Sequence, residues 1–332
     1  YYPATPYSSN LIGFAAYDED KQSIEGKLGL ELSLNPLLKG KNGKEQYQQT
    51  VDGSKLPGTT KVIEQSKNGK DVVLTLDSEL QSTVETQLQS TMENENAKSA
   101  WCIVMEVDTG KVLAWASYPT FDQNEHKEIP SYQDAISTST YEPGSVMKPF
   151  TYATAIDTNV YPYNKTYVSY QFWYDYDAST GKITRLPIGT NSPYPYIADA
   201  LDENFGEITF DQGLAFSSNV AICELLANYI NYSQYSKYLD AFGFFQKVNT
   251  PYVDQSLGVK NIGLPTDYLS TGFGQASSIT VLQLCQAYTA IFNDGTMVRP
   301  YVIDSIVDSD TGKVEKKYKK KAVGTPISST TA

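Results

Sequence analysis

Histidine is almost absent from the sequence, and cysteine is scarce. The only histidine, His126, falls in a polar stretch where we expect a solvated loop, so a metal centre built from several imidazoles is excluded. The three cysteines, Cys102, Cys223 and Cys285, lie far apart and form no Cys-x-x-Cys pair. Because their number is odd, they allow at most one disulfide, and free, buried thiols are the expected state.

Long apolar runs and positive charge are also missing. The longest apolar run, residues 100–107, is interrupted by Glu106 and has the length of a strand, whereas a membrane-spanning helix needs about 20 apolar residues. The sequence has 26 basic and 38 acidic residues, which gives a net charge of -12. This balance argues against a basic face for non-specific binding of nucleic acid and against a basic membrane anchor.

The remaining composition is that of an ordinary globular protein. Apolar residues make up 40% and charged residues 19% of the chain, enough to bury a core, and a length of 332 residues suggests about two domains. Residues 1–68 are polar and rich in turn-forming residues, so they predict short strands and loops without a large core. From residue 69 the pattern becomes regular, and we place a second domain over residues 69–332.

The second domain opens with a strand and a helix. Residues 72–76 predict the strand, and Asp77 is a suitable N-cap because its carboxylate can accept a backbone N–H at the start of a helix. The helix that follows has an apolar face in which every fourth residue is hydrophobic. That face consists of Leu80, Val84, Leu88 and Met92.

Later segments add a sheet and a helical cluster. Residues 108–111 predict a hairpin turn between a buried strand at 100–107 and a returning strand at 112–117. Further elements are expected in this order: helices at 146–157, 220–230, 233–242 and 278–293, then a strand at 302–306 and a hairpin turn at 308–313. The order predicts an α/β or α+β fold with an antiparallel sheet.

The string Ser145-Val146-Met147-Lys148 is the sharpest local feature. Pro143-Gly144 breaks the chain ahead of an apolar helix, so Ser145 lies at a helix N-terminus. Lys148 is three residues further on and is therefore a neighbour of Ser145 on the helix. A serine hydroxyl becomes a nucleophile when a base removes its proton, and a lysine whose pKa is lowered by burial can be that base. Taken alone, the string also fits a serine N-cap followed by a solvated lysine.

A second candidate string is Ser217-Ser218-Asn219. It lies between two apolar helical runs, residues 210–216 and 220–230. Taken alone, it favours a helix–loop–helix turn capped by serine or asparagine. In a functional interpretation, the hydroxyl of Ser217 relays a proton to a leaving group, and the amide of Asn219 holds a lysine and a substrate carbonyl.

Together the two strings match a known set of motifs, S-x-x-K followed by S-x-N. The chain resembles the class B penicillin-binding proteins, which are monofunctional cell-wall transpeptidases, and the resemblance runs over nearly its whole length. The stretches that look like the family's N-terminal pedestal are residues 11–14, 25–31 and 38–43. The stretches that resemble its transpeptidase domain are residues 71–80, 142–148, 211–213, 217–219 and 272–275.

The resemblance implies a penicillin-binding, serine-transpeptidase fold, with an antiparallel sheet, a helical subdomain and a small β-rich pedestal at the N-terminus. It also implies a serine D,D-transpeptidase that cross-links peptidoglycan stem peptides without a metal or other cofactor. In that reaction Ser145 attacks the D-Ala–D-Ala carbonyl to form an acyl-enzyme, and Lys148 takes its proton. Ser217 passes a proton to the leaving D-alanine, and Asn219 positions the substrate and Lys148. β-Lactams would acylate the same Ser145.

The expected partners follow from the same resemblance. They are peptidoglycan stem peptides or a lipid-linked precursor, β-lactam antibiotics, a glycosyltransferase and other proteins of cell division or elongation, with no nucleic acid. The family is anchored outside the cytoplasmic membrane by one N-terminal helix. Because the sequence shown does not include such a helix, we expect it to be the soluble, extracytoplasmic part of a single-pass membrane protein.

One motif of the family is missing from the sequence. No Lys-Thr-Gly or Lys-Ser-Gly string occurs, and Thr311-Gly312-Lys313 has the wrong order and lies in a hairpin turn. The last residues, 326–332, read as a helix N-terminus cut short, and the chain begins at Tyr1 without methionine or a secretory signal. We therefore expect a processed or engineered segment whose C-terminal part was lost or lies in another chain.

Three alternatives stay open. A serine β-lactamase would share the chemistry but lack the pedestal. A β-lactam sensor would be acylated without catalysing transpeptidation. A catalytically incomplete protein would act through its pedestal as a scaffold of the cell-wall machinery, and a Lys-Thr-Gly string downstream in the gene would exclude that scaffold.

Two further segments each allow two interpretations. Residues 161–196 contain eight tyrosines and are expected to form a loop whose rings pack on the domain, with an extended peptide- or glycan-binding cleft as the alternative. The lysine-rich residues 316–321 predict a solvated edge strand that resists aggregation. Contact of these lysines with an anionic wall polymer or with lipid headgroups is the alternative.

Overall fold

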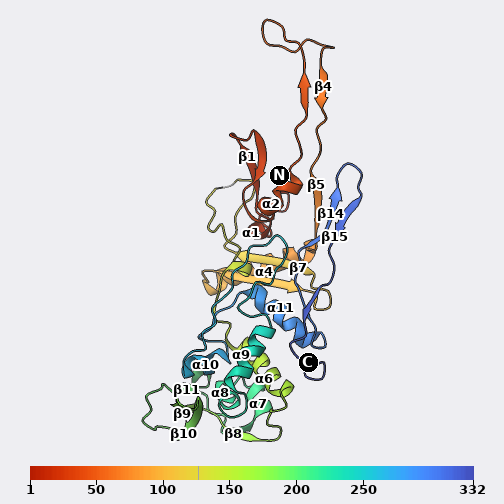
Figure 1. Cartoon of the computed structure of the whole chain (residues 1–332). Helices are drawn as coiled ribbons and strands as arrows, with labels where there is room; N and C mark the ends of the chain where they lie inside the picture. The colour runs from red at the N-terminus through yellow and green to blue at the C-terminus, as the bar shows by residue number, and fades with distance from the viewer. Residues whose placement is uncertain (126) are drawn as a thin grey trace.

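The chain folds into an elongated molecule of α+β architecture (Figure 1). The computed structural model describes residues 1–125 and 127–332, so the expectation for His126 lies outside the described residues. The N-terminal region lies at one end of the molecule, a strand-rich layer in the middle and a helical subdomain at the other end. Within the described ranges, no helix combines the length and the apolar character needed to cross a membrane.

The N-terminal region contains short helices as well as the predicted short strands. Its elements are α1 (Ser9–Ile12), β1 (Ala15–Asp18), β2 (Ser23–Gly26), α2 (Gly29–Ser33), α3 (Asn35–Leu38), β3 (Lys44–Gln46) and β4 (Lys61–Glu64). These helices were not predicted, because each has only four or five residues, too few for an apolar stripe to repeat. β3 and β4 form an exposed ribbon that extends away from the rest of the molecule.

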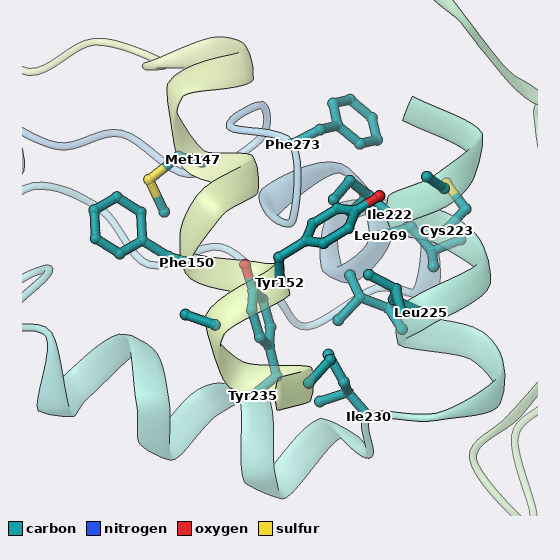
Figure 2. Packing of buried hydrophobic residues seen from close by; sticks show 14 of the residues in the cluster. Met147, Phe150, Tyr152, Ile222, Cys223, Leu225, Ile230, Tyr235, Leu269 and Phe273 are labelled. Atoms are coloured by element: carbon teal, nitrogen blue, oxygen red, sulfur yellow. The ribbon is translucent and has the colours of Figure 1, made fainter. Parts of the chain in front are cut away.

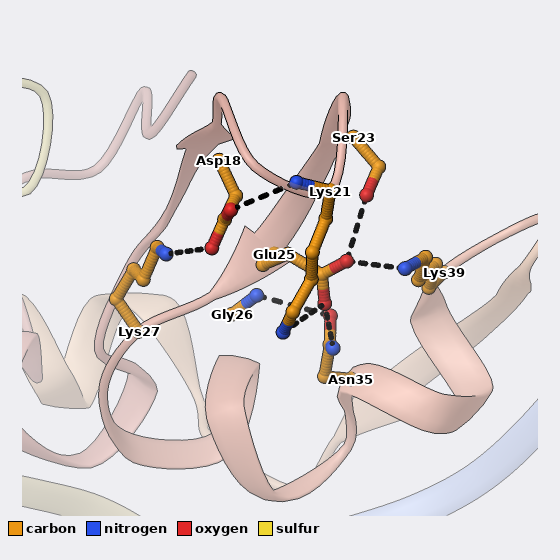
Figure 3. A network of polar contacts seen from close by, with 8 residues as sticks. All are labelled: Asp18, Lys21, Ser23, Glu25, Gly26, Lys27, Asn35 and Lys39. Atoms are coloured by element: carbon orange, nitrogen blue, oxygen red, sulfur yellow. Dashed lines mark hydrogen bonds and ion pairs between the residues drawn. The ribbon is translucent and has the colours of Figure 1, made fainter.

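A buried carboxylate ties β2 to α3 (Figure 3). Glu25 on β2 is 4% exposed and forms an ion pair with Lys39, the residue that follows α3. It also accepts hydrogen bonds from the Ser23 hydroxyl at 2.7 Å and from the Asn35 amide at 2.6 Å. The hydrogen bond from Lys39 is the main cause that lowers the pKa of Glu25 to about 2, so this carboxylate stays charged at neutral pH.

The hydrophobic core continues across the predicted boundary at residue 68. Leu11, Leu30 and Leu34 from the N-terminal region pack in one cluster with Trp115 and Leu282, which lie far along the chain. A second, larger cluster fills the helical subdomain. The division of the chain at residue 68 therefore stays a prediction, and the two parts share a core where they meet.

The middle layer consists of a hairpin and a three-stranded antiparallel sheet. Its elements are β5 (Lys70–Leu74), α4 (Ser78–Glu95), β6 (Ala100–Met105), β7 (Val112–Tyr118), α11 (Val281–Phe292), β14 (Ile303–Asp308) and β15 (Val314–Lys317). β6 and β7 form the predicted hairpin, although β6 is half-buried rather than buried, and α4 and α11 pack against it. The sheet has the order β15–β14–β5, and its edge strand β15 is exposed along its whole length. Of the lysine-rich residues 316–321, predicted as a solvated edge strand, only Lys316 and Lys317 belong to it.

The predicted helix after Asp77 is present, but its buried positions are polar. Asp77 caps α4 by accepting the N–H of Leu80 at 2.8 Å, as expected. The expected apolar face is only half-buried, and Gln81 and Glu85 are the buried residues. The reason is that β7 leaves main-chain groups unpaired on the side facing α4, and buried main-chain groups need partners. The Gln81 amide supplies them, because it accepts the N–H of Trp115 at 2.8 Å and donates to its carbonyl at 3.0 Å.

The helical subdomain is built around one central helix (Figure 2). Its elements are the 3-10 turn η1 (Gly144–Met147), α6 (Lys148–Asp157), α7 (Phe210–Ala215), α8 (Asn219–Asn228), α9 (Tyr232–Ala241) and α10 (Pro265–Thr271). Phe150 of α6 makes edge-to-face contacts with Phe242, Phe244 and Tyr288, with ring centroids 4.9 to 5.0 Å apart. Such packing fixes the side chains at the start of α6, which is where the S-x-x-K string lies.

The tyrosine-rich segment is not the loop that the sequence predicts. It folds into β8 (Thr166–Val168), β9 (Gln171–Asp177), β10 (Lys182–Leu186) and β11 (Ile197–Ala198). β9 pairs with both β10 and β11, and its rings Phe172 and Tyr174 are completely buried, so the expected packing of rings on the domain is confirmed. The smaller elements of the chain are α5 (Ala135–Thr138), the 3-10 turn η2 (Ala200–Asp202), β12 (Glu207–Thr209), β13 (Met297–Val298) and β16 (Ala322–Gly324).

Candidate active site

The exposed serine of the first motif lies on a tight turn ahead of α6. Ser145 is in η1, one 3-10 turn before the helix, rather than on the α-helix itself. Gly144 adopts a φ of 69°, a left-handed conformation that glycine tolerates, and its N–H donates to the carbonyl of Gly274 at 2.8 Å. A Cβ on Gly274 would lie 2.0 Å from the carbonyl oxygen of Gly144, so this close approach requires glycine. The backbone contact between Gly144 and Gly274 therefore fixes the turn that carries Ser145.

Lys148 connects the two motifs. Its side chain is 2% exposed, and its Nζ lies 3.0 Å from Oγ of Ser145 and 2.9 Å from Oγ of Ser217. The Nζ also donates to the carbonyl of Ser217 at 2.5 Å. Three residues of spacing along the turn place Ser145 beside the amine, while the fold brings Ser217 to its other side.

Burial changes the protonation of this amine. Desolvation lowers the pKa of Lys148 to about 8, and the nearby negative charge of Asp199 opposes that shift. At pH 7 roughly a tenth of the amine is then neutral and able to accept a proton. A solvated lysine, the alternative for this string, is excluded by the burial of the side chain.

Ser217 reaches Lys148 through an unusual backbone conformation. Its φ is 59°, in the left-handed region that serine rarely adopts, between the end of α7 and the start of α8. The next residue, Ser218, caps α8 by accepting the N–H of Ala221 at 3.0 Å, so the structural interpretation of this string holds for Ser218. The left-handed turn directs both the carbonyl and the hydroxyl of Ser217 at Lys148. Strained residues of this kind gather at functional sites.

Asn219 does not contact the lysine as expected. Its amide nitrogen donates to the carbonyl of Ala198 on β11 at 2.9 Å, and no hydrogen bond to Lys148 is present among the described residues. The amide therefore fixes the motif to a neighbouring strand, because α8 begins at Asn219 and faces β11. Its proposed contact with substrate stays a prediction.

Sequence reasoning missed Asp199, which holds the second motif in place. This buried carboxylate accepts hydrogen bonds from the Ser218 hydroxyl at 2.8 Å, from the N–H of Val220 at 3.0 Å and from the N–H of Tyr170 at 3.1 Å. It also contributes negative charge near Lys148. No local pattern marks Asp199, since only the fold brings the end of β11 to the start of α8.

The arrangement contains the parts of a serine acyl-transfer centre. The buried amine of Lys148, with its lowered pKa, lies within 3.0 Å of two exposed hydroxyls, those of Ser145 and Ser217. The described residues hold no group of three or more histidine, cysteine or acidic side chains that could bind a metal. The three cysteines are free thiols, as expected, but only Cys223 is buried, whereas Cys102 and Cys285 are half-buried.

Comparison with known proteins identifies the family. Residues 100–332 match the family described as the penicillin-binding protein transpeptidase domain, which is more than half of the chain. The chain belongs to this family of penicillin-binding proteins. Residues 1–74 match the penicillin-binding protein dimerisation domain. The resemblance drawn from the motifs is thereby confirmed.

Individual relatives agree with this assignment. The penicillin-binding protein is 28% identical over 324 residues to stage V sporulation protein D of Bacillus subtilis, covering 96% of this chain and 47% of that protein. It is 28% identical over 305 residues to a probable peptidoglycan D,D-transpeptidase, PenA, of Neisseria meningitidis, covering 90% of this chain and 48% of that protein. The chain spans about half the length of the curated relatives it matches.

Solved structures confirm the predicted fold. Penicillin-binding protein 2X from Streptococcus thermophilus superimposes with a TM-score of 0.84 at 28% identity, over 99% of this chain and 47% of that one. Penicillin-binding protein 3 from Mycobacterium tuberculosis, in its apo form, superimposes with a TM-score of 0.78 at 25% identity, over 100% of this chain and 66% of that one. The α+β transpeptidase fold expected from the motifs is therefore the fold of this penicillin-binding protein.

Proposed function

We propose that this chain carries the acyl-transfer centre of a serine D,D-transpeptidase that cross-links peptidoglycan. The observation that supports this most is the position of the Lys148 Nζ, 3.0 Å from Oγ of Ser145 and 2.9 Å from Oγ of Ser217. One buried amine thereby connects an exposed nucleophile with a second hydroxyl. Relatives that are named D,D-transpeptidases supply the reaction class.

In the first half-reaction, the Oγ of Ser145 attacks the carbonyl carbon between the two terminal D-alanines of a stem peptide. Its proton passes to the neutral Nζ of Lys148, which lies within hydrogen-bond distance. As the C–N bond breaks, the Oγ of Ser217 gives its proton to the departing amine and recovers one from Lys148. The products are an acyl ester on Ser145 and free D-alanine, with Lys148 neutral again.

In the second half-reaction, the amine of a neighbouring stem peptide attacks the ester. Ser217 and Lys148 accept the proton that this amine loses, and the Oγ of Ser145 leaves and is reprotonated. A new peptide bond forms, and the enzyme returns to its starting state. The amide nitrogen of Asn219 donates to Ala198, so we assign the carbonyl oxygen of its side chain as the group that accepts a hydrogen bond from the substrate.

The substrates and partners are part of the same proposal. Stem peptides, or a lipid-linked precursor that carries them, are the acyl donors and acceptors, and β-lactams acylate the same serine because their ring amide mimics the scissile bond. A glycosyltransferase and proteins of division or elongation are the proposed assembly partners. The transpeptidase centre acts outside the cytoplasmic membrane, where peptidoglycan is built, and an N-terminal helix anchors the protein.

Intact mass spectrometry after incubation with penicillin tests the nucleophile. We expect the mass to rise by one penicillin equivalent in the wild-type chain and to stay unchanged in Ser145→Ala. Ser233→Ala on α9 is the matched control, because it removes an exposed serine hydroxyl outside the site and is expected to form the adduct normally. An adduct that persists in Ser145→Ala, or its absence in the wild-type chain, would contradict the proposal.

A second measurement separates transpeptidation from penicillin binding alone. The acyl-enzyme is formed from a D-Ala–D-Ala depsipeptide or stem peptide and then offered an amine acceptor such as D-alanine or glycine. Release of the amide product supports the transpeptidase, whereas release of the free acid alone indicates a hydrolase. An acyl-enzyme that releases neither product indicates a sensor.

A further inference from the structure

The lysine-rich segment of residues 316–321 forms one wall of a groove outside the active site. We call it the basic groove and define it by its lining residues: Pro251, Tyr252, Arg299, Lys316, Lys317, Tyr318, Lys319, Lys320 and Lys321. Its volume is about 580 Å³, within the range of about 300–1,000 Å³ typical of ligand sites. Six of the nine lining residues are cationic and none is acidic, in a chain whose net charge is -12.

The walls of the basic groove are fixed by backbone hydrogen bonds. The N–H of Arg299 donates to the carbonyl of Lys321 at 3.0 Å, and the N–H of Tyr318 donates to the carbonyl of Asp304 at 2.8 Å. On the opposite side, the Thr250 hydroxyl donates to the carbonyl of Pro300 at 3.1 Å and holds the loop that carries Tyr252. The cations are therefore presented by an ordered surface rather than by a loose tail.

No carboxylate in the part of the chain that the structure describes pairs with a cation of the groove. Among the described residues, Lys316, Lys317 and Lys319–Lys321 form no ion pair with a carboxylate, whereas other lysines such as Lys70 and Lys260 do. The Nζ of Lys316 lies 4.6 Å from the centre of the Tyr318 ring, so even this contact leaves its charge uncompensated. Five ammonium groups close together repel one another unless an anion screens them.

The two arginines of the chain differ in their contacts with the protein. Arg185 pairs with Glu224 and donates to the carbonyls of Val168 and Gln171. The guanidinium of Arg299 makes no such contact with any described residue, and its Nε is buried without a hydrogen-bond partner. Arg299 as a whole is only half-buried and lines the groove, and a guanidinium without a carboxylate partner fits oxyanions such as phosphate best.

We propose that the basic groove binds a phosphate polymer, with one phosphate on the Arg299 guanidinium and its neighbours on the lysines. Lys317 ends β15, and Lys319, Lys320 and Lys321 follow it along the same wall of the groove, so several cations lie close together along the chain and can contact successive phosphates. A flat membrane surface fits less well, because the lining residues enclose a groove of about 580 Å³. The groove shares no residue with Ser145, Lys148 or Ser217, so it would tether the enzyme without occupying its centre.

Binding of short-chain inorganic polyphosphate to the full chain tests the proposal. We expect saturable binding that weakens as salt rises, because phosphate contacts release counterions. Lys319→Gln/Lys320→Gln/Lys321→Gln is expected to weaken binding roughly 100-fold, and Arg299→Gln roughly tenfold. Thermal melting confirms that each variant is folded.

The matched control is Lys41→Gln/Lys61→Gln/Lys67→Gln, which removes the same charge from exposed lysines around the β3–β4 ribbon. It is expected to change affinity less than about threefold, as diffuse electrostatics would. Equal losses in both triple variants would overturn the proposal in favour of non-specific attraction. Equal affinity for polyglutamate of the same charge would overturn the preference for phosphate. Binding to vesicles of phosphatidylglycerol and phosphatidylcholine, without binding to polyphosphate, would identify a membrane surface instead.

Discussion

Two buried charged side chains, one in the N-terminal region and one in the helical subdomain, have lowered pKa values with opposite consequences. Glu25 is 4% exposed and Lys148 is 2% exposed. The pKa of Glu25 is lowered to about 2 by Lys39 and neighbouring hydrogen-bond donors, which favours the charged carboxylate. The pKa of Lys148 is lowered to about 8 by desolvation, which favours the neutral amine.

The two pKa shifts indicate a structural role for Glu25 and a chemical role for Lys148. Every neighbour of Glu25 stabilises its charge, so the N-terminal region gains order and no reactive group. Lys148 is instead surrounded by two serine hydroxyls and a carbonyl, and burial keeps a fraction of it neutral near physiological pH. A buried lysine that forms no ion pair with a carboxylate can act as a base in proton transfer.

The largest expected effect is the loss of that base. Lys148→Met should lower the rate of acylation by a β-lactam about 1,000-fold, since general-base catalysis contributes roughly 10²–10⁴-fold. Stopped-flow measurement with a chromogenic cephalosporin gives the rate. Lys237→Met, at an exposed position of α9, should react like the wild type. A rate for Lys148→Met within tenfold of the wild type would contradict the assignment of the base.

The acylation rate should depend on pH through Lys148 and not through Glu25. Because the neutral amine of Lys148 is the reactive form, the acylation rate should rise roughly 50-fold from pH 6 to pH 8 and level off above about pH 8. Glu25→Gln should leave this profile unchanged. A flat profile between pH 6 and pH 8 would mean that Lys148 does not titrate there.

Replacing Lys148 by methionine should raise the free energy of unfolding, although it lowers the acylation rate. The pKa of Lys148 is lower in the folded chain than the ordinary value of 10.5, so the unfolded chain binds more protons between about pH 8 and pH 10.5. Wild-type stability therefore rises across that window, and below pH 8 the buried charge opposes folding in full. Lys148→Met should raise the free energy of unfolding by about 2 kcal/mol at pH 7 and by almost nothing above pH 10.5. Denaturant titrations at both pH values measure this, and a destabilised variant at pH 7 would contradict it.

Asp199→Asn should produce a smaller, roughly tenfold loss of acylation rate. The substitution weakens the hydrogen bonds that fix Ser218 and Val220, and it removes negative charge that raises the pKa of Lys148. The midpoint of the pH profile should therefore move to lower pH, which a purely structural role would not cause. An unchanged midpoint would limit Asp199 to a structural role.

The smallest expected effect lies at Glu25. Because its folded pKa is about 2, the stabilisation by the charged carboxylate is present above about pH 4.5 and is lost as the pH falls towards 2. Glu25→Gln should speed amide hydrogen exchange of residues 23–39 severalfold at pH 7 without changing acylation. Glu19→Gln, an exposed neighbour, should change neither. Slower acylation in Glu25→Gln would show that Glu25 affects the active site, which contradicts a purely structural role.

The sequence predicted the parts of the site that depend on local spacing. Ser145 and Lys148 are three residues apart, so their contact follows from turn geometry, and the cap of α4 by Asp77 follows from the same kind of rule. The motif resemblance then brought Ser217 into the prediction. The role predicted for Asn219 at Lys148 stays a prediction: its amide nitrogen donates to Ala198 of β11, a strand in the tyrosine-rich segment that the sequence predicted as a loop.

Other features depend on tertiary contacts and left no local signal. Asp199 and the buried Gln81 and Glu85 accept hydrogen bonds from main-chain N–H groups that are distant in sequence, so periodicity could not find them. The left-handed conformation of Ser217 likewise needs support from the surrounding helices. The shared core of the N-terminal region with Trp115 arises for the same reason.

Direct titration of Lys148 tests the central claim most closely. With lysine labelled at Cε by carbon-13, the NMR signal that disappears in Lys148→Met reports this residue alone among the lysines. We predict a midpoint near pH 8, coincident with the midpoint of the acylation rate. A midpoint above pH 10, together with an acylation rate that still rises between pH 6 and pH 8, would show that another group supplies the base.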